Sequence, residues 1–272
     1  MRLRKPVLLV VLASLTAAAG CSRLTFVKPK FKNDYHRTAP EYSVHDDPDD
    51  ARRIAAMDQV ALAQQGLEAG RIDEAAAHAA AAVKADPRSV GGYTLLAMIE
   101  GQRGNTAQAG KHYAKAAELA PGQGAALNNY GAWLCGNGRP AESLALFDRA
   151  LADQSYATPA AALANAGSCA LDAGQDARAA RDLDRALQLD PTSAVALAAM
   201  ALSQYRAGHY LEARAFSERR LAVAPASVKV LQLASQIEQK LGDSAAAARY
   251  VQRIGAEFPR QRTGPTGDAS QR

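Results

Sequence analysis

Apolar residues recur at helical spacing along most of this chain, and glycine and proline interrupt them at regular intervals. The range 127–151 illustrates the pattern. Tyr130 and Leu134 belong to one apolar stripe, Phe147 belongs to a second, and a break around Gly138 separates the two. The pattern predicts two short amphipathic helices joined by a tight turn. Because so small a pair cannot bury both stripes by itself, it needs further helices on each side.

The breaks repeat with a period of 34 residues. Successive glycines are 34, 34, 36, 34 and 34 residues apart, and prolines are 34, 70, 34 and 34 apart, so both series indicate one two-residue insertion near residues 154–159. Glycine ends the first helix of each pair in a conformation that costs other residues free energy, and proline cannot continue the second helix. The positions are Gly70, Gly104, Gly138, Gly174, Gly208, Gly242, Pro87, Pro121, Pro191, Pro225 and Pro259.

A helix–turn–helix period of this length resembles the tetratricopeptide repeat. Degenerate matches to its motif occur in register along the chain. Those of the third repeat are Leu127, Tyr130, Gly131, Leu134, Ser143, Phe147 and Ala150. The resemblance implies an all-α fold: a right-handed α-solenoid of six tetratricopeptide (TPR) helix–turn–helix repeats over residues 54–259, with a concave face lined by the first helices.

Composition agrees with an all-helical protein, because hydrophobic residues make up 48% of the chain, aromatic residues only 6%, and alanine is abundant. The formal net charge is +5, but Arg2, Arg4 and Lys5 lie in an expected export signal. Without them the chain has 29 basic and 27 acidic residues, a net charge of +2. No basic block and no nucleic-acid-binding motif occurs, so no nucleic-acid partner is expected.

Residues 1–20 have the organisation of a lipoprotein signal peptide, with a basic start, an apolar run and small residues before Cys21. The apolar run is too short to span a bilayer as a mature helix. The sequence LTAAAGC resembles a bacterial lipobox, which implies cleavage before Cys21 and lipid attachment to it; a plain secretory cleavage site is the alternative. Since Ser22 rather than Asp follows, the analogy with such lipoproteins favours a lipid-anchored protein on the periplasmic face of the outer membrane.

Residues 21–53 are rich in charge and proline and lack helical periodicity, so we expect a lipidated N-terminal tether there. Its HDDPDD cluster could suggest a divalent cation. An acidic run that caps a helix starting near Ala51, with Asp49 or Asp50 at the helix N-terminus, explains the cluster better, so no metal is expected. Residues 260–272 are polar, and we predict a disordered tail.

No catalytic or nucleotide-binding motif occurs, and the five histidines are scattered. His78 and His112 occupy equivalent places on the second helices of successive repeats. A metal pair is one interpretation, and equivalent solvent-facing positions are the simpler one. We therefore expect neither an enzyme nor a cofactor.

Cys135 and Cys169 both fall late in the first helix of consecutive repeats, and these helices are neighbours in a stack. In an exported protein a disulfide between them would persist and tie the third repeat to the fourth. Two small buried apolar side chains are the alternative.

The concave face is expected to bind a peptide or a helix of a partner protein. Arrays that grip a C-terminal carboxylate use basic and amide side chains on the first helices; Asn129 matches one such place, but Ala161 and Asn165 leave the clamp incomplete. The candidate groove residues are Thr94, Met98, Asn128, Ala132, Ala164, Ser168 and Leu202.

Three segments carry a narrower resemblance: NNYGAWLC from residue 128, ALANAGSCAL from residue 162, and AS at residue 226 followed by QIEQKLGD from residue 236. They are similar to the type IV pilus biogenesis/stability lipoprotein family (PilW/PilF). The resemblance implies a monomeric outer-membrane pilotin that binds the secretin of the type IV pilus and promotes its localisation and multimer assembly. Gln232 departs from the family, since a larger apolar or aromatic residue is expected there. The alternative function is a general cell-envelope TPR scaffold, an adaptor for peptidoglycan hydrolases or for outer-membrane assembly.

Overall fold

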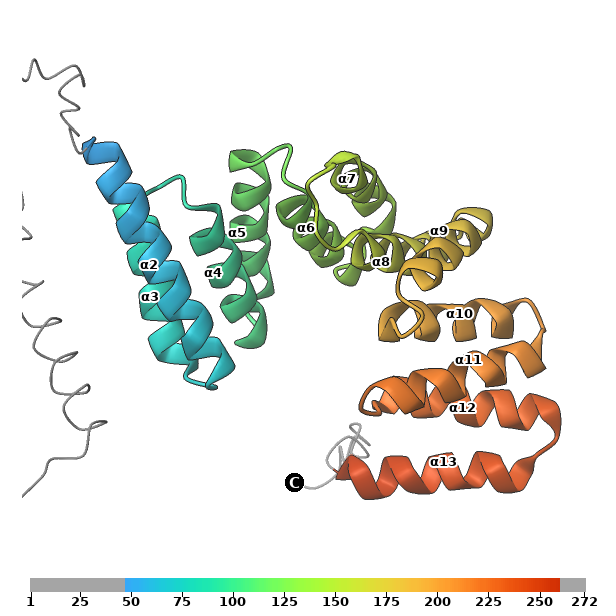
Figure 1. The fold of residues 1–272 in the computed structure, drawn as a ribbon. Helices are drawn as coiled ribbons and strands as arrows, with labels where there is room; N and C mark the ends of the chain where they lie inside the picture. The colour runs from blue at the N-terminus through green and yellow to red at the C-terminus, as the bar shows by residue number, and fades with distance from the viewer. Residues whose placement is uncertain (1–46, 260–272) are drawn as a thin grey trace, which may run out of the picture. The chain divides into compact units, whose positions relative to one another are not determined.

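The computed structural model describes residues 47–259. Within that range the chain forms α-helices and no β-strand (Figure 1). The predicted signal peptide, the lipid attachment at Cys21, most of the tether and the tail lie outside the described residues.

Twelve helices in the described range form six antiparallel pairs that stack in chain order. Each helix contacts its partner, and each first helix also contacts the first helix of the next pair. The predicted solenoid of tetratricopeptide-like repeats is therefore confirmed. The helices are α2 (Pro48–Glu68), α3 (Ile72–Ala85), α4 (Val90–Gln102), α5 (Thr106–Leu119), α6 (Gly124–Gly136), α7 (Pro140–Ala152), α8 (Pro159–Asp172), α9 (Asp176–Leu189), α10 (Ala194–Arg206), α11 (Tyr210–Val223), α12 (Val228–Leu241) and α13 (Ser244–Glu257).

The six periodic glycines follow the six first helices, and every one has a positive φ between 71° and 82°. That conformation turns the chain back for the second helix, as the sequence predicts. The two-residue insertion also lies where expected, between α7 and α8. There the Asp153 carboxylate accepts hydrogen bonds from the backbone N–H of Gly124 (2.8 Å) and of Ser155 (2.9 Å). The bond from Gly124, followed by those from Ser155, holds the pKa of Asp153 below its usual value.

The first helix starts earlier than the sequence suggests. It begins at Pro48 rather than near Ala51, and its cap is Asp47, whose side chain accepts from the Asp49 backbone N–H, rather than Asp49 or Asp50. Proline suits the first helical position because its missing N–H would have no partner there. The helix therefore occupies residues 48–53, which the sequence pattern assigns to the tether.

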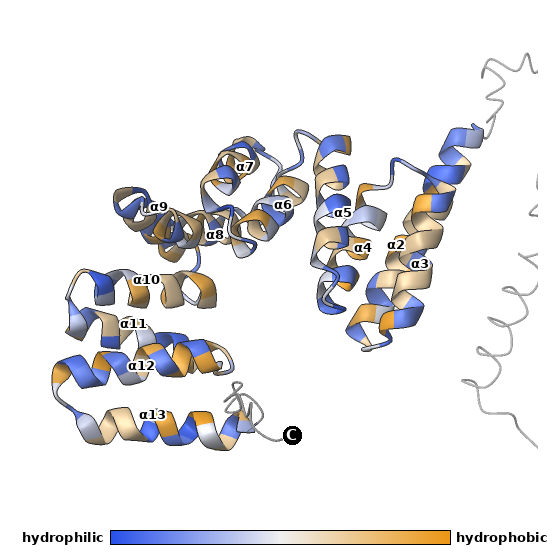
Figure 2. Cartoon of the chain, turned by 180° about the vertical axis from the view of Figure 1, so that it is seen from behind, coloured by the Kyte–Doolittle hydropathy of each residue, from blue (hydrophilic) through white to orange (hydrophobic). Residues whose placement is uncertain are grey.

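Small side chains let the helices approach closely. Alanines form much of the buried core, and the helices carry both hydrophobic and hydrophilic residues (Figure 2). The largest core cluster joins α7, α8, α9 and α10, where Phe147, Leu163 and Leu183 are fully enclosed. The apolar stripe of each pair is thus buried by its neighbours, as a stack of repeats requires.

Gly110 of α5 faces the indole of Trp133, which stacks on Tyr130 of the same helix, α6, at a ring distance of 6.1 Å. A Cβ atom on Gly110 would lie 2.2 Å from the Trp133 Cζ2 atom. We expect Gly110→Ala to lower the free energy of unfolding by about 1–3 kcal/mol, because the indole must move out of a packed interface. Urea unfolding followed by circular dichroism measures the loss.

Gly101 of α4 is the matched control for this substitution. It is exposed, and a Cβ atom there would meet nothing within 4 Å. Gly101→Ala should leave stability unchanged or raise it by about 0.5–1 kcal/mol, since alanine favours the helix. Equal effects of the two substitutions would contradict the proposed steric conflict at Trp133.

Candidate functional site

Two hollows are each lined by residues from several first helices. The N-terminal hollow has a volume of about 540 Å³ and lies on α2, α4 and α6. Its lining residues are Gln64, Leu67, Glu68, Val90, Gly91, Thr94, Leu95, Met98, Gln123, Ala125, Ala126 and Asn129. The C-terminal hollow has a volume of about 420 Å³ and lies on α8, α10 and α12, with one residue from α11. Its lining residues are Ser168, Ala194, Val195, Ala198, Ala199, Leu202, Arg220, Lys229, Val230, Gln232, Leu233 and Gln236.

The C-terminal hollow combines an apolar floor with basic side chains. Val195 is 47% exposed, although it is a large aliphatic residue on a packed helix. Arg220 donates to the backbone carbonyls of Ala224 (3.0 Å) and Pro225 (3.2 Å), which holds its guanidinium beside the hollow. Lys229 is exposed, and no carboxylate among residues 47–259 lines this hollow. The arrangement can receive an apolar segment that carries negative charge.

The N-terminal hollow has the opposite charge. Within the part of the chain that the structure describes, its charged lining residue is Glu68, and no basic side chain lines it. Met98 supplies exposed apolar surface, while the Thr94 hydroxyl donates to the Val90 carbonyl (2.9 Å) and so faces its own helix. The two hollows therefore differ in the ligands that they favour.

Four of the seven predicted groove residues line a hollow. Thr94 and Met98 line the N-terminal hollow, and Ser168 and Leu202 line the C-terminal one. Gln232, at the position where the resemblance implies a larger apolar or aromatic residue, is exposed and lines the C-terminal hollow.

Asn128, Ala132 and Ala164 line neither hollow. Asn128 is only 8% exposed and accepts a hydrogen bond from Asn165 (3.0 Å), and Ala164 is buried in the central core. Ala132 packs against the same core. The prediction is wrong for Asn128 and Ala164 because α6 and α8 lie close enough here to enclose both side chains.

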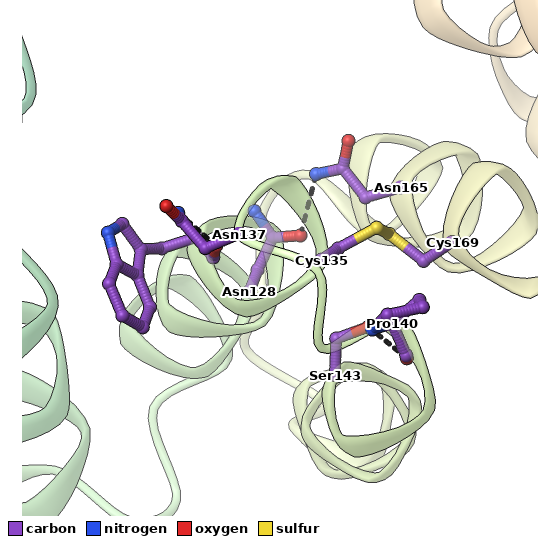
Figure 3. The surroundings of a disulfide bond; sticks show 8 residues. Asn128, Cys135, Asn137, Pro140, Ser143, Asn165 and Cys169 are labelled. Carbon is purple, nitrogen blue, oxygen red and sulfur yellow. Dashed lines mark hydrogen bonds between the residues drawn. A yellow bond between two sulfur atoms is a disulfide. The ribbon is translucent and has the colours of Figure 1, made fainter. Parts of the chain in front are cut away.

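A disulfide joins Cys135 of α6 to Cys169 of α8 (Figure 3). The two Cα atoms are 5.8 Å apart, within the range that a disulfide spans. The hydrogen bond between Asn165 and Asn128 lies on the same two helices. Both links tie the third repeat to the fourth, between the two hollows.

The two equivalent histidines make separate local contacts and are partly buried. His78 pairs through Nδ1 with Gln59 (2.8 Å), and His112 pairs through Nε2 with Gln108 (3.0 Å). Burial lowers the pKa of His112. Among residues 47–259, no three His, Cys, Asp or Glu side chains are grouped so as to hold a metal ion. In the same range, no helix is both long enough and apolar enough to cross a bilayer.

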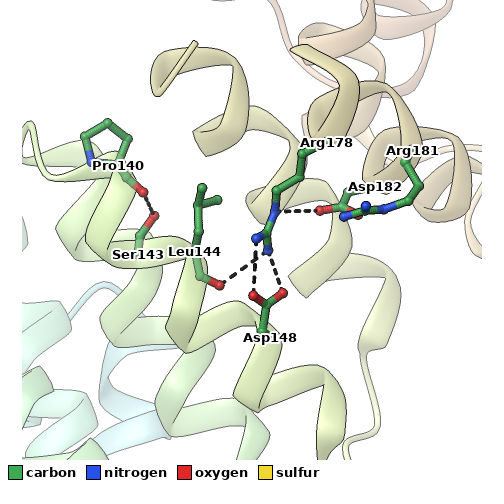
Figure 4. Close-up of polar contacts among 7 residues, drawn as sticks. All are labelled: Pro140, Ser143, Leu144, Asp148, Arg178, Arg181 and Asp182. Atoms are coloured by element: carbon green, nitrogen blue, oxygen red, sulfur yellow. Dashed lines mark hydrogen bonds and ion pairs between the residues drawn. The ribbon is translucent and has the colours of Figure 1, made fainter. Parts of the chain in front are cut away.

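An ion pair connects the second helices of the third and fourth repeats. The Arg178 guanidinium of α9 donates to Asp148 of α7 (2.6 Å) and to buried Asp182 (3.2 Å), and it also contacts the Leu144 carbonyl (Figure 4). These contacts leave Asp182 hydrogen-bonded, as a buried carboxylate requires. The contacts of Arg178 with Asp148 and Leu144 hold α9 against α7.

Comparison with known proteins supports the same fold. A tetratricopeptide-repeat family model matches residues 90–123, the second repeat. The chain is similar to the crystal structure of PilW, described as a widely conserved type IV pilus biogenesis factor, with 31% identity, a TM-score of 0.67, and coverage of 75% of this chain and 94% of that one. It also resembles PilF of Pseudomonas aeruginosa in fold, with 22% identity, a TM-score of 0.65, and coverage of 77% and 95%. A search of curated proteins by sequence found no match.

Proposed function

Because the chain belongs to the PilW-like family of tetratricopeptide-repeat proteins, we propose that it is a pilotin of the type IV pilus. In this role it binds secretin subunits and promotes their delivery to the outer membrane and their assembly into multimers. It performs no catalysis of its own. Its surface brings subunits together.

The similarity to PilW carries this proposal. It extends over 94% of that structure at 31% identity, so it includes the arrangement of repeats and not one motif alone. The two hollows on the first helices add a physical basis, since each exposes apolar side chains that a partner segment could cover. A scaffold of this kind is typical of proteins that bind other proteins.

We further propose that lipid on Cys21 anchors the protein to the periplasmic face of the outer membrane. Residues between Cys21 and the first helix would then act as a tether, which confines the repeats to the volume near the membrane. Confinement raises the effective concentration of the binding surface where secretin subunits must insert. More than one acyl chain is needed for stable anchoring.

Deleting the gene tests the proposed function. We expect the deletion strain to lose most detergent-resistant secretin multimers and surface pili, with secretin monomer still made. Restoring the wild-type gene should recover both, whereas Cys21→Ser should recover multimers poorly or leave them in the wrong membrane. Immunoblots of separated inner and outer membranes measure the outcome.

Normal multimers and pili in the deletion strain would rule out a pilotin. Affinity capture of peptidoglycan hydrolases without secretin would instead support the scaffold alternative.

A further inference from the structure

We propose that the C-terminal hollow is a docking site for an acidic amphipathic helix of the partner, with the apolar face of that helix on α10 and α12 and its carboxylates beside Lys229 and Arg220. This proposal rests on the proposed function in one respect only, which is that the partner is the secretin.

The apolar floor has the spacing of a helix-binding surface. Val195 and Leu202 are seven residues apart on α10 and line the hollow together. Seven residues are two helical turns, so these side chains are about 10 Å apart along one face of α10. Leu233 of α12 extends the floor. A partner helix with apolar residues at the same two-turn spacing can cover this floor with one face.

The charge of the hollow selects an acidic segment. Among the described residues, the charged ones that line the hollow are Arg220 and Lys229, and both are basic. Arg220 is already held by two backbone carbonyls, so its guanidinium is positioned before a ligand arrives. A carboxylate at the rim would therefore be attracted, and a lysine or arginine would be repelled.

Charge also argues against two segments of this molecule as occupants. Residues 22–37 contain five Lys or Arg and one Asp, and residues 260–272 contain three Arg and one Asp, so both segments are net basic. The N-terminal hollow, which carries Glu68 and no basic lining residue from the described range 47–259, would repel an acidic helix. An acidic partner segment is therefore directed to the C-terminal end of the array.

Two synthetic peptides test the proposal: a 16-residue helix with leucine on one face and glutamate on the other, and the same peptide with lysine in place of glutamate. We expect the full chain, purified with Cys21→Ser, to bind the glutamate peptide at least tenfold more tightly. Fluorescence anisotropy at low and moderate salt measures both affinities, and added salt should weaken the preferred complex.

Lys229→Glu should weaken binding of the glutamate peptide by roughly tenfold and improve binding of the lysine peptide. Lys240→Glu is the matched control, because Lys240 is exposed on the same helix but lies outside the hollow. Val195→Asp should weaken the same complex, and this exposed position tolerates a polar side chain. Equal binding of both peptides, or identical effects of Lys229→Glu and Lys240→Glu, would overturn the proposal.

Overlapping peptides of the secretin then separate the two proposals. Competition by an acidic secretin peptide, lost in Lys229→Glu, would support both. If the glutamate peptide binds as described but no secretin peptide competes and secretin does not co-purify with the chain, the docking chemistry stands and the pilotin function fails. If secretin co-purifies equally with Lys229→Glu and with the wild-type chain, the pilotin function stands and the docking site is elsewhere.

Discussion

Replacing Phe147 with alanine is expected to lower the free energy of unfolding of the repeat domain by about 3–5 kcal/mol. Phe147 of α7 has no exposed surface and belongs to the core cluster that joins four helices of the third, fourth and fifth repeats. Its ring lies against Gly131 of α6, where a Cβ atom would be only 2.9 Å from the ring carbon Cε1. The interface is so close that neighbouring backbone cannot easily collapse into the cavity left by the ring, which places the loss toward the upper end of this range.

Urea unfolding followed by far-ultraviolet circular dichroism measures this change. Phe216→Ala is a graded comparison, because Phe216 only partly buries its ring against the same cluster. Leu211→Ala is the control for loss of an apolar residue without a cavity, since Leu211 is 66% exposed. We expect Phe147→Ala to be the most damaging, Phe216→Ala intermediate, and Leu211→Ala within about 0.5 kcal/mol of the wild type. A loss below about 1 kcal/mol for Phe147→Ala would contradict the packing described for α6 and α7.

Removing the disulfide is expected to cost about 3–4 kcal/mol. Cys135 and Cys169 are 34 residues apart, and cross-linking a loop of that length reduces the conformational entropy of the unfolded chain by roughly that amount. The double variant Cys135→Ala/Cys169→Ala should therefore unfold at lower urea concentration than the oxidised protein. The first helices of the third and fourth repeats keep their other contacts, including the bond between Asn165 and Asn128, so the variant should still fold.

Reductant provides the control for this experiment. In a Cys21→Ser background, the remaining cysteines are the bonded pair. Reductant should destabilise that protein and increase its mass by two hydrogen atoms, but it should change neither property of the double variant. If the oxidised protein and the double variant unfold at the same urea concentration, the cross-link has no effect on stability. If reduction adds no mass, the purified protein contains no bond.

Sequence periodicity predicted the repeat architecture because each break has a local cause. The turn at Gly138, like the other five, needs a positive φ that glycine adopts readily, so the residue type marks the turn without knowledge of the fold. The same reasoning placed the insertion between α7 and α8. It was less successful at the first helix, because Asp47 and Pro48 form a helix start but also resemble an acidic, proline-containing tether.

The candidate groove was predicted only in part. The period identifies the first helices as its source, and two of the residues that it selected, Leu202 and Met98, line the hollows, while their contact with a partner stays a prediction. It does not fix the rotation of each helix about its axis. The side chains of adjacent residues point in directions about 100° apart around the helix axis. An error in the assumed rotation of the helix therefore exchanges a lining residue for a buried neighbour. Asn128 was misplaced in this way, and Lys229 was missed because its position at the start of α12 has no distinctive pattern.

The sequence by itself determined that this protein is a stack of six helix pairs, where each pair turns and where one turn is two residues longer. Those features depend on local backbone preferences and on apolar spacing, which neighbouring residues in the chain specify. Only the tertiary structure decided that Cys135 and Cys169 meet, that Asn128 is enclosed, and that the two hollows carry opposite charge. Each of these features depends on how closely successive first helices approach and on how each is rotated about its axis. Side chains from several repeats jointly determine that packing.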